Sequence, residues 1–161
     1  MAGYIKFDGI DGESEDTNHK GWSDVISFNQ SFEKPCPPGA TGVSRQRADT
    51  IPNDVLVVKK LDKASPKLSE AICKGKVFGS VKIELTRTYT DGNRVAYFKY
   101  ELKNVLITHY GIGGAAQSAD IPVEELRLNF EEIKVTYTIA DAKGKSSGNV
   151  EYTWKVGEGK S

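Results

Sequence analysis

Two histidines, His19 and His109, are the first residues to consider for catalysis, because a Ser-His-Asp or Cys-His arrangement requires one. His109 stands next to Tyr110 at the end of an apolar strand pattern, and His19 lies in an acidic loop. Neither histidine belongs to a motif that would present a nucleophile. We therefore expect no catalytic residues and no enzyme activity, with a hydrolase that uses a reactive serine as an alternative.

Acidic side chains near the start of the chain suggest calcium binding as a second kind of chemistry. These side chains are Asp8, Asp11, Glu13, Glu15 and Asp16. An EF-hand loop places its oxygen ligands at alternate positions before a distant glutamate, and this stretch does not follow that spacing. We interpret it as a solvated turn and expect no metal.

A glycine-rich segment suggests nucleotide binding as a third kind. Residues 111–116 have the form G-x-G-x-x-A after a strand pattern, and Glu131 and Glu132 follow about 20 residues on, as in a dinucleotide fingerprint. However, no apolar helical face follows before Pro122, and the rest of the chain shows no βαβ unit. We therefore expect no cofactor.

Charge and composition exclude further classes. The 161 residues include 22 basic and 22 acidic side chains, so the formal net charge is zero. A nucleic-acid-binding protein usually has a basic excess, because phosphate neutralisation supplies much of its affinity. The longest aliphatic run, 55–58, is far shorter than the ~20 residues that span a bilayer. We expect no nucleic-acid partner, no membrane insertion and, from the first eight residues, no signal peptide.

The two cysteines, Cys36 and Cys73, match no metal-ligand or redox spacing. Without a secretory signal, we expect two thiols in a reducing compartment, with Cys73 packed on a helix face.

Strands must position any site, because period-two alternation dominates the chain. Strands are predicted over 5–8, 22–32, 54–61, 81–86, 96–102, 105–107, 126–130, 133–139 and 150–156. An Asp-Gly pair in 90–93 predicts a hairpin, 140–148 is a polar turn, and a change of phase across Glu131 and Glu132 predicts a β-bulge. This pattern indicates an all-β barrel or sandwich in a single domain, residues 1–161.

Two of these strands have distinctive faces. In 22–32, one face carries Ile26, Phe28 and Phe32, and the other carries Ser27, Asn29 and Ser31. A core face would not hold three small polar groups in alternation, so we expect the second face to meet solvent. Segment 54–61 is a compact Val/Leu run, which predicts a strand buried on both faces.

One segment has a helical period. In 65–75, Ser65 is suited to the N-cap and Pro66 to the first helical position. Leu68, Ala71 and Ile72 share one face, and Gly75 is suited to end the helix. We expect a short helix that packs against the barrel.

Two long loops, 35–52 and 111–122, are the first places to look for a site. Pro35, Pro37 and Pro38 stiffen the start of the first loop, which a flexible linker would not need. Its turn-forming and charged residues are Gly39, Gly42, Arg45, Arg47 and Asp49. The residues alone indicate a domain that binds something through loops or a sheet edge.

Three groups of residues resemble signatures of the haemolysin-coregulated protein (Hcp) family, the inner-tube proteins of bacterial type VI secretion. The first is 5–14 with Asp16 and 19–20, and the second is Asp62-Lys63-Ala64-Ser65-Pro66-Lys67-Leu68 with 75–76. The third is 104–107, Tyr110, the 111–114 loop and 126–137, and the final hairpin near Trp154 is also similar. The likeness covers nearly the whole chain; the Pro-rich 35–52 segment departs from the Gly-rich tract of relatives.

This resemblance implies a β-barrel of two packed antiparallel or mixed sheets with a flanking helix at about 65–75, which assembles as a ring. Rings of six copies would stack into a hollow tube, tipped by a VgrG-like spike protein and driven by a contractile sheath into another cell. Effectors would be carried and protected in the lumen. The chain would lie in the bacterial cytoplasm before firing and outside the cell, or in a target cell, afterwards.

The resemblance also assigns roles to the two candidate surfaces. Relatives contact effectors through small polar residues on a lumen-facing strand, which implies that role for Ser27, Asn29 and Ser31, with Asn29 first. In the family, an extended loop at 35–52 reaches the neighbouring ring, which implies stacking roles for Gly39, Gly42, Arg45, Arg47 and Asp49. The alternatives are a barrel that binds a small ligand and a tube protein of a related, phage-tail-like contractile system.

Overall fold

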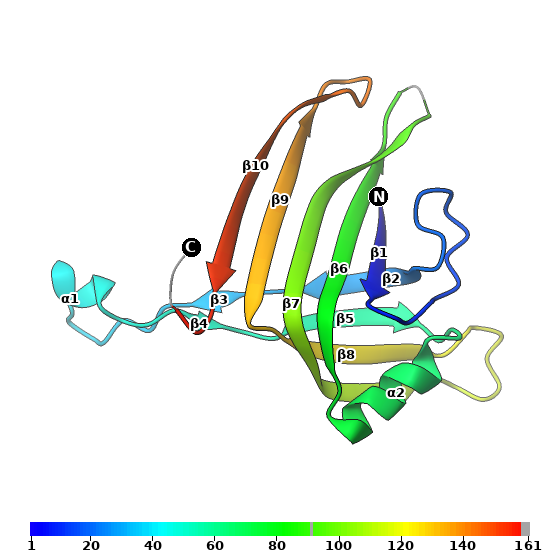
Figure 1. Ribbon diagram of the computed structural model, residues 1–161, viewed down its shortest axis with the longest axis horizontal. Coiled ribbons are helices and arrows are strands. Elements are labelled where there is room, and N and C mark those ends of the chain that lie inside the picture. The colour runs from blue at the N-terminus through cyan, green and yellow to red at the C-terminus, as the bar shows by residue number, and fades with distance from the viewer. Residues whose placement is uncertain (91, 159–161) are drawn as a thin grey trace.

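The computed structural model describes residues 1–90 and 92–158, and its elements are mostly strands (Figure 1). Their bounds are β1 Ala2–Phe7, β2 Ser23–Asn29, β3 Phe32–Glu33, α1 Val43–Gln46, β4 Ile51–Pro52, β5 Val55–Lys60, α2 Ser65–Lys74, β6 Val77–Thr88, β7 Arg94–Gly113, β8 Val123–Asn129, β9 Glu132–Ala140 and β10 Ser146–Lys155.

Six strands close into a barrel, in the order β7-β6-β1-β2-β5-β8 and back to β7. The described pairings within it are all antiparallel. Strands β9 and β10 continue the sheet beyond the barrel from the first half of β7, and with β7 and β6 they form the upright sheet of Figure 1. The predicted barrel with a flanking helix is therefore confirmed.

The barrel interior is a packed hydrophobic core. The alternation read from the sequence places one face of each strand inward, because successive side chains of a strand point to opposite sides. The largest completely buried apolar side chains are Phe7, Phe78, Ile5, Leu68, Ile83, Leu102, Leu126, Leu128 and Ile133. Bulky aliphatic and aromatic groups thus fill the space between the walls.

A corner shared by two strands replaces the bulge predicted at Glu131 and Glu132. Leu106 pairs with Asn129 and Lys103 with Glu132, so both strands advance by three residues between these pairs and none is inserted. Asn104 has a φ of 51° and its side-chain amide donates to Glu131 Oε2 at 2.8 Å. The prediction of a bulge was therefore wrong. The prediction of a separate strand at 105–107 was also wrong, because β7 runs through the corner without a break.

Strand β2 also differs from its prediction. It ends at Asn29, and Phe32 belongs to β3. The register against β5 shifts between Val25 and Ser27. This irregularity turns Ile26 outward, leaving it 53% exposed, whereas Phe28 packs against the core, so these two side chains do not share a buried face.

Strand β5 is buried on one face only. Val55, Val57 and Lys59 are completely buried, whereas Leu56 and Val58 are half-buried. The prediction of burial on both faces was therefore wrong, because β5 forms part of a barrel wall with the core on one side.

Helix α2 lies against the barrel as expected. Leu68 and Ala71 are buried, and Gly75 has a φ of 62° and donates its N–H to the carbonyls of Ala71 and Ile72. The N-cap is Ala64 rather than Ser65. Asp62 accepts the Ala64 N–H instead, at 3.0 Å. Cys73, expected on the packed face, is exposed.

The hairpin turns follow the sequence. Strands β6 and β7 pair up to Thr88 and Arg94, and Gly92 has a φ of 76°, as the Asp-Gly turn predicts; Asp91 itself lies outside the described residues. The polar turn connects β9 and β10.

Candidate assembly surfaces

The 35–52 segment forms an arm that projects from the barrel (Figure 1). At its base, Phe32 pairs with Pro52 and Glu33 with Ile51, and Asn53 donates from its backbone and its side chain to Ser31. The arm also contains α1, four residues long, which the sequence analysis missed. A short paired base thus holds a long exposed tip.

All five predicted stacking residues lie on this arm and are exposed: Gly39, Gly42, Arg45, Arg47 and Asp49. Gly39 and Gly42 have φ values of 77° and 54°, backbone conformations that favour glycine. Within the described part of the chain, neither Arg45 nor Arg47 has a carboxylate within ion-pairing distance. Basic groups are therefore presented to solvent at the tip.

The second predicted surface is the outer face of β2. Ser27 and Asn29 are exposed on it, as expected, whereas Ser31 lies in the turn after β2, where its hydroxyl accepts from Asn53 at 2.9 Å. Ser31 therefore does not continue this face.

Strand pairing extends the β2 face to residues that sequence reasoning missed. Asn29 lies opposite Leu56, Leu56 opposite Arg127, and Arg127 opposite His109. Ser27 similarly faces Val58, which faces Glu125. The alternation within each strand could have predicted that these side chains point outward. It could not have predicted that they lie beside Ser27 and Asn29, because alternation does not show which strands are neighbours.

A third surface is a row of mostly apolar residues on the side of the sheet that faces the core. The row runs from β2 to β10 through directly paired residues, which are Val25, Gly3, Leu85, Phe98, Tyr137 and Val150. Leu85 is buried in the middle, but Tyr137 is 44% and Val150 63% exposed. Part of the core face therefore continues beyond the barrel, and residues 1–90 and 92–158 leave it uncovered.

His19 is a buried structural group, whereas the side chain of His109 is about half exposed and lies 3.8 Å from Glu125 Oε1. His19 is 3% exposed and stacks on Tyr4 at 4.1 Å between ring centroids. Its nitrogens lie 2.6 Å from Asp16 Oδ2 and 2.8 Å from Glu84 Oε2. Both nitrogens are occupied, so His19 anchors its loop to β1 and β6 and is not free to activate a nucleophile.

A buried charged network lies under α2, and the sequence analysis did not foresee it. Lys59 is completely buried and forms ion pairs with Glu124 and with Asp62, the latter at 2.9 Å. Tyr110 donates to Glu124 Oε2 at 2.6 Å. Burial would raise the pKa of Asp62, but hydrogen bonds from Ser23 and Lys59 outweigh it, and the pKa lies below its ordinary value. Burial and then Glu124 raise the pKa of Tyr110.

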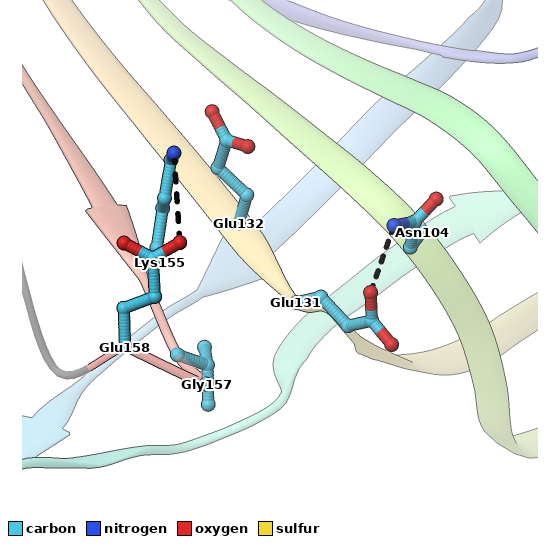
Figure 2. Close-up of a pocket in the computed structure, with 7 residues that line it drawn as sticks. Asn104, Glu131, Glu132, Lys155, Gly157 and Glu158 are labelled. Carbon is cyan, nitrogen blue, oxygen red and sulfur yellow. Dashed lines mark hydrogen bonds and ion pairs between the residues drawn. The ribbon is translucent and has the colours of Figure 1, made fainter.

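The pockets offer little chemistry. One of about 560 Å³ opens beside the shared corner and the end of β10, where Figure 2 shows Glu131 turned toward Asn104 and Glu158 toward Lys155. Each of these carboxylates thus has a partner within the chain. Across residues 1–90 and 92–158, no three His, Cys, Asp or Glu side chains are placed to hold a metal ion.

Two other sequence features are placed by the fold. Gly111 and Gly113 end β7, and the residues from 114 to 122 form a loop to β8, so no helix follows the G-x-G-x-x-A segment. In the described ranges, neither helix has the length and apolar character needed to cross a membrane.

Comparison with known proteins gives consistent matches over most of the chain. The family model described as "Type VI secretion system effector, Hcp" matches residues 4–137. Protein hcp1 of Pseudomonas aeruginosa is 28% identical over 154 residues, which cover 95% of this chain and 93% of the relative.

Solved structures agree. A type six secretion system protein superposes with a TM-score of 0.89 at 28% identity, covering 99% of this chain and 98% of the other. A type VI secretion system effector from Yersinia pestis gives 0.76 at 25% identity, covering 96% and 99%. Hcp1 from Salmonella typhimurium has the same fold, with a TM-score of 0.79 at 21% identity and coverage of 99% and 97%.

Proposed function

The chain belongs to the Hcp family of type VI secretion system proteins, and from this premise we propose that it is a structural tube protein. Six copies close into a ring, and rings stack into the inner tube that sheath contraction expels. The work consists of assembly and transport, with no covalent chemistry. Both ring nitrogens of His19 are engaged by carboxylates, and the corner-pocket carboxylates of Glu131 and Glu158 pair with other residues of the chain. These pairings support a role without catalysis.

The observation that carries this proposal is the uncovered part of the apolar row. Monomeric proteins rarely leave contiguous apolar surface next to an unpaired strand edge, because such edges aggregate. Here Tyr137, Val150 and Tyr152 are exposed, and β10 pairs only with β9 in the described part of the chain. Ring closure would cover both the side chains and the edge.

The outer face of β2 supports a lumen that holds effectors. Ser27 and Asn29 are small, uncharged and exposed, and Leu56 and Arg127 extend their surface sideways. An expelled tube must release its cargo, and the small polar side chains of Ser27 and Asn29, which offer few apolar contacts, suit weak, reversible binding.

Asn29→Trp tests this lumen assignment. The bulky indole would crowd the lumen, so we expect intact rings with reduced retention of a co-expressed effector, measured by co-purification. Asp24→Asn, on the same exposed side near the start of β2, serves as the control. Unchanged retention in rings of Asn29→Trp would show that this face does not line the lumen.

The arm supports a stacking role. The arm is joined to the barrel through β3 and β4, and its residues 46–50 share a hollow with the end of β10. Its exposed basic groups are free to meet a neighbouring ring. The remaining partners follow from the tube role: a VgrG-like spike, the contractile sheath and secreted effectors. The chain would act in the bacterial cytoplasm before firing and outside the cell afterwards.

A barrel that binds a small ligand is the less favoured alternative, because aromatic and aliphatic side chains fill the interior. Native mass spectrometry, with two-dimensional class averages of the purified protein, tests the proposed function. We expect six-membered rings. A monomer over a wide concentration range would overturn the proposal.

A further inference from the structure

We propose that the segment 13–20, in the loop between β1 and β2, is held to the barrel by a pH-sensitive clamp at His19. The clamp is closed while the imidazole ring carries a proton on each nitrogen, and it opens when a rise in pH removes one of them. The contacts that carry this inference lie within one protomer, so it goes beyond the proposed tube and does not depend on it.

The geometry of His19 requires both ring protons. Its Nδ1 faces Asp16 Oδ2 and its Nε2 faces Glu84 Oε2, each at hydrogen-bonding distance. A carboxylate only accepts hydrogen bonds, whereas a neutral imidazole has one donor nitrogen and one acceptor nitrogen. A neutral ring could therefore satisfy one carboxylate, and its other nitrogen would face oxygen lone pairs.

Two cations on β7 favour the ionised form of both carboxylates. Arg94 donates from Nη1 to Asp16 Oδ1 at 3.0 Å, and Lys99 Nζ lies 3.4 Å from Glu84 Oε1. The hydrogen bond from His19 contributes most to holding the pKa of Asp16 below its ordinary value. An ionised carboxylate cannot supply the proton that a neutral ring would lack, so the two contacts depend on the imidazolium.

Burial prevents water from replacing these partners. The ring is sandwiched against Tyr4 of β1 and meets Trp22 edge-on, with 5.0 Å between the ring centroids. Burial and then Asp16 raise the pKa of the Tyr4 hydroxyl, and Asp24 of β2, opposite Tyr4 in the register, adds a smaller effect, so this hydroxyl stays neutral. A carboxylate left without its donor here is unfavourable, because it is also shielded from solvent.

The clamped segment has few other attachments to the strands. Among residues 1–90 and 92–158, the side-chain hydrogen bonds that join 13–20 to the barrel are His19 with Glu84 and Arg94 with Asp16. The other hydrogen bonds of the segment, such as that from the Ser14 N–H to the Trp22 carbonyl, stay within the loop. Losing the His19 contact therefore weakens most of what fixes the segment.

Opening the clamp would change one end of the molecule. Glu13 and Glu15 are exposed on the segment, and the His19 ring covers Tyr4, which is 4% exposed. The segment precedes β2 and the arm follows it, so the two lie at opposite ends of this strand (Figure 1). A rise in pH would thus uncover an aromatic ring and free two carboxylates at the end away from the arm.

Nuclear magnetic resonance tests the link between the ring and the segment. Long-range ¹H–¹⁵N spectra follow the protons of the His19 ring over a pH series, and amide spectra of the same samples follow residues 13–20. We expect the amide signals to move with the same midpoint as the ring. The half-exposed His109, the other histidine of the chain, is the control, and its titration should move no amide of the segment.

Limited trypsin digestion measures the opening itself. Cleavage after Lys20, divided by cleavage after the exposed Arg45 of the arm, corrects for the activity of the protease. When opening is faster than cleavage, this ratio follows the open population, and it should rise by up to about tenfold per pH unit, the limit for loss of one proton.

Two variants should shift this ratio in opposite directions. The amide of His19→Gln can donate to one carboxylate only, so the ratio should be high at every pH. The amide of Glu84→Gln can turn to donate to a neutral Nε2, so the ratio should stay low as the pH rises. Circular dichroism checks the fold, and Glu84→Gln decides the matter if His19→Gln unfolds. A wild-type ratio that is independent of pH, segment amides with a different midpoint from the ring, or wild-type opening in Glu84→Gln would overturn the clamp.

Discussion

Helix α2 and the arm lie close together in the chain, yet they are attached to the barrel in opposite ways. The helix buries Leu68 and Ala71 and sits over the charged network of Lys59 and Glu124. The arm is joined through β3, β4 and the hydrogen bonds between Ser31 and Asn53. The contrast indicates that α2 determines whether the protomer folds, whereas the arm is available for contacts with other molecules.

The strongest test of this contrast is Leu68→Asp. The substitution places an unpaired carboxylate in a completely buried position, which should lower the free energy of unfolding by about 3–5 kcal/mol. Urea unfolding measures the loss, and Lys67→Asp, one residue away on the exposed side, is the control. Equal unfolding midpoints for the two variants would contradict the packing of α2.

Lys59→Met should have the next largest effect. It keeps most of the side-chain volume but leaves Glu124 and Asp62 buried without their cation, which should cost about 3 kcal/mol. The neighbouring Lys60 is exposed, so Lys60→Met should change stability by less than about 0.5 kcal/mol. A stability for Lys59→Met as high as that of the wild type would mean that the network is not needed to hold this part of the barrel.

Asp62 gives the network a pH dependence. Its pKa is lower in the folded protein than in the unfolded chain, so the folded state favours the carboxylate. Its contribution is therefore present above the unfolded pKa of about 4 and is lost as the pH falls through the folded value. Asp62→Asn should be less stable at pH 7 and should lose less stability than the wild type below about pH 4. Thermal unfolding at pH 7 and pH 3 compares them, and parallel losses would exclude Asp62 as the source.

The same contrast explains how far sequence reasoning could go. Local patterns predicted most of the barrel strands and α2, because alternation, Pro66 and Gly75 act within a few residues. The corner at Asn104 was wrongly predicted as a bulge at Glu131 and Glu132. The corner forms because both paired strands bend at the same point with no residue inserted, and this pairing cannot be read from either strand alone. The ion pair of Lys59 could not be predicted, because its partner Glu124 is distant in sequence and is brought near by the β5–β8 pairing.

The candidate surfaces divide in the same way. The exposure of the arm residues and of Ser27 and Asn29 could be predicted because each set lies in one segment, whereas their stacking and lumen roles remain predictions. Ser31 was misplaced, since the end of β2 could not be located from alternation alone. The apolar row and the extension through Leu56 and Arg127 each combine residues from several strands, and their register is set by the closed barrel.

The smallest effect on stability is expected from reversing the charge of the arm tip. Arg45 and Arg47 are exposed and have no ion-pair partner in the described residues, so Arg45→Glu with Arg47→Glu should change the melting temperature little and leave the six-membered ring intact. If the tip makes the proposed stacking contact, the reversed charge should impair the formation of tubes in solution and secretion.

A matched charge reversal at Lys63 and Lys67, both exposed and without an ion-pair partner in the described residues, separates the arm from a general effect of net charge, because it changes the total charge equally. Electron microscopy of tubes and a secretion assay measure the outcome. Wild-type secretion by the arm variant would contradict a stacking role. Loss of the ring itself would instead show that the arm reaches the neighbour within one ring, and the contrast between helix and arm would then become one between folding and ring closure.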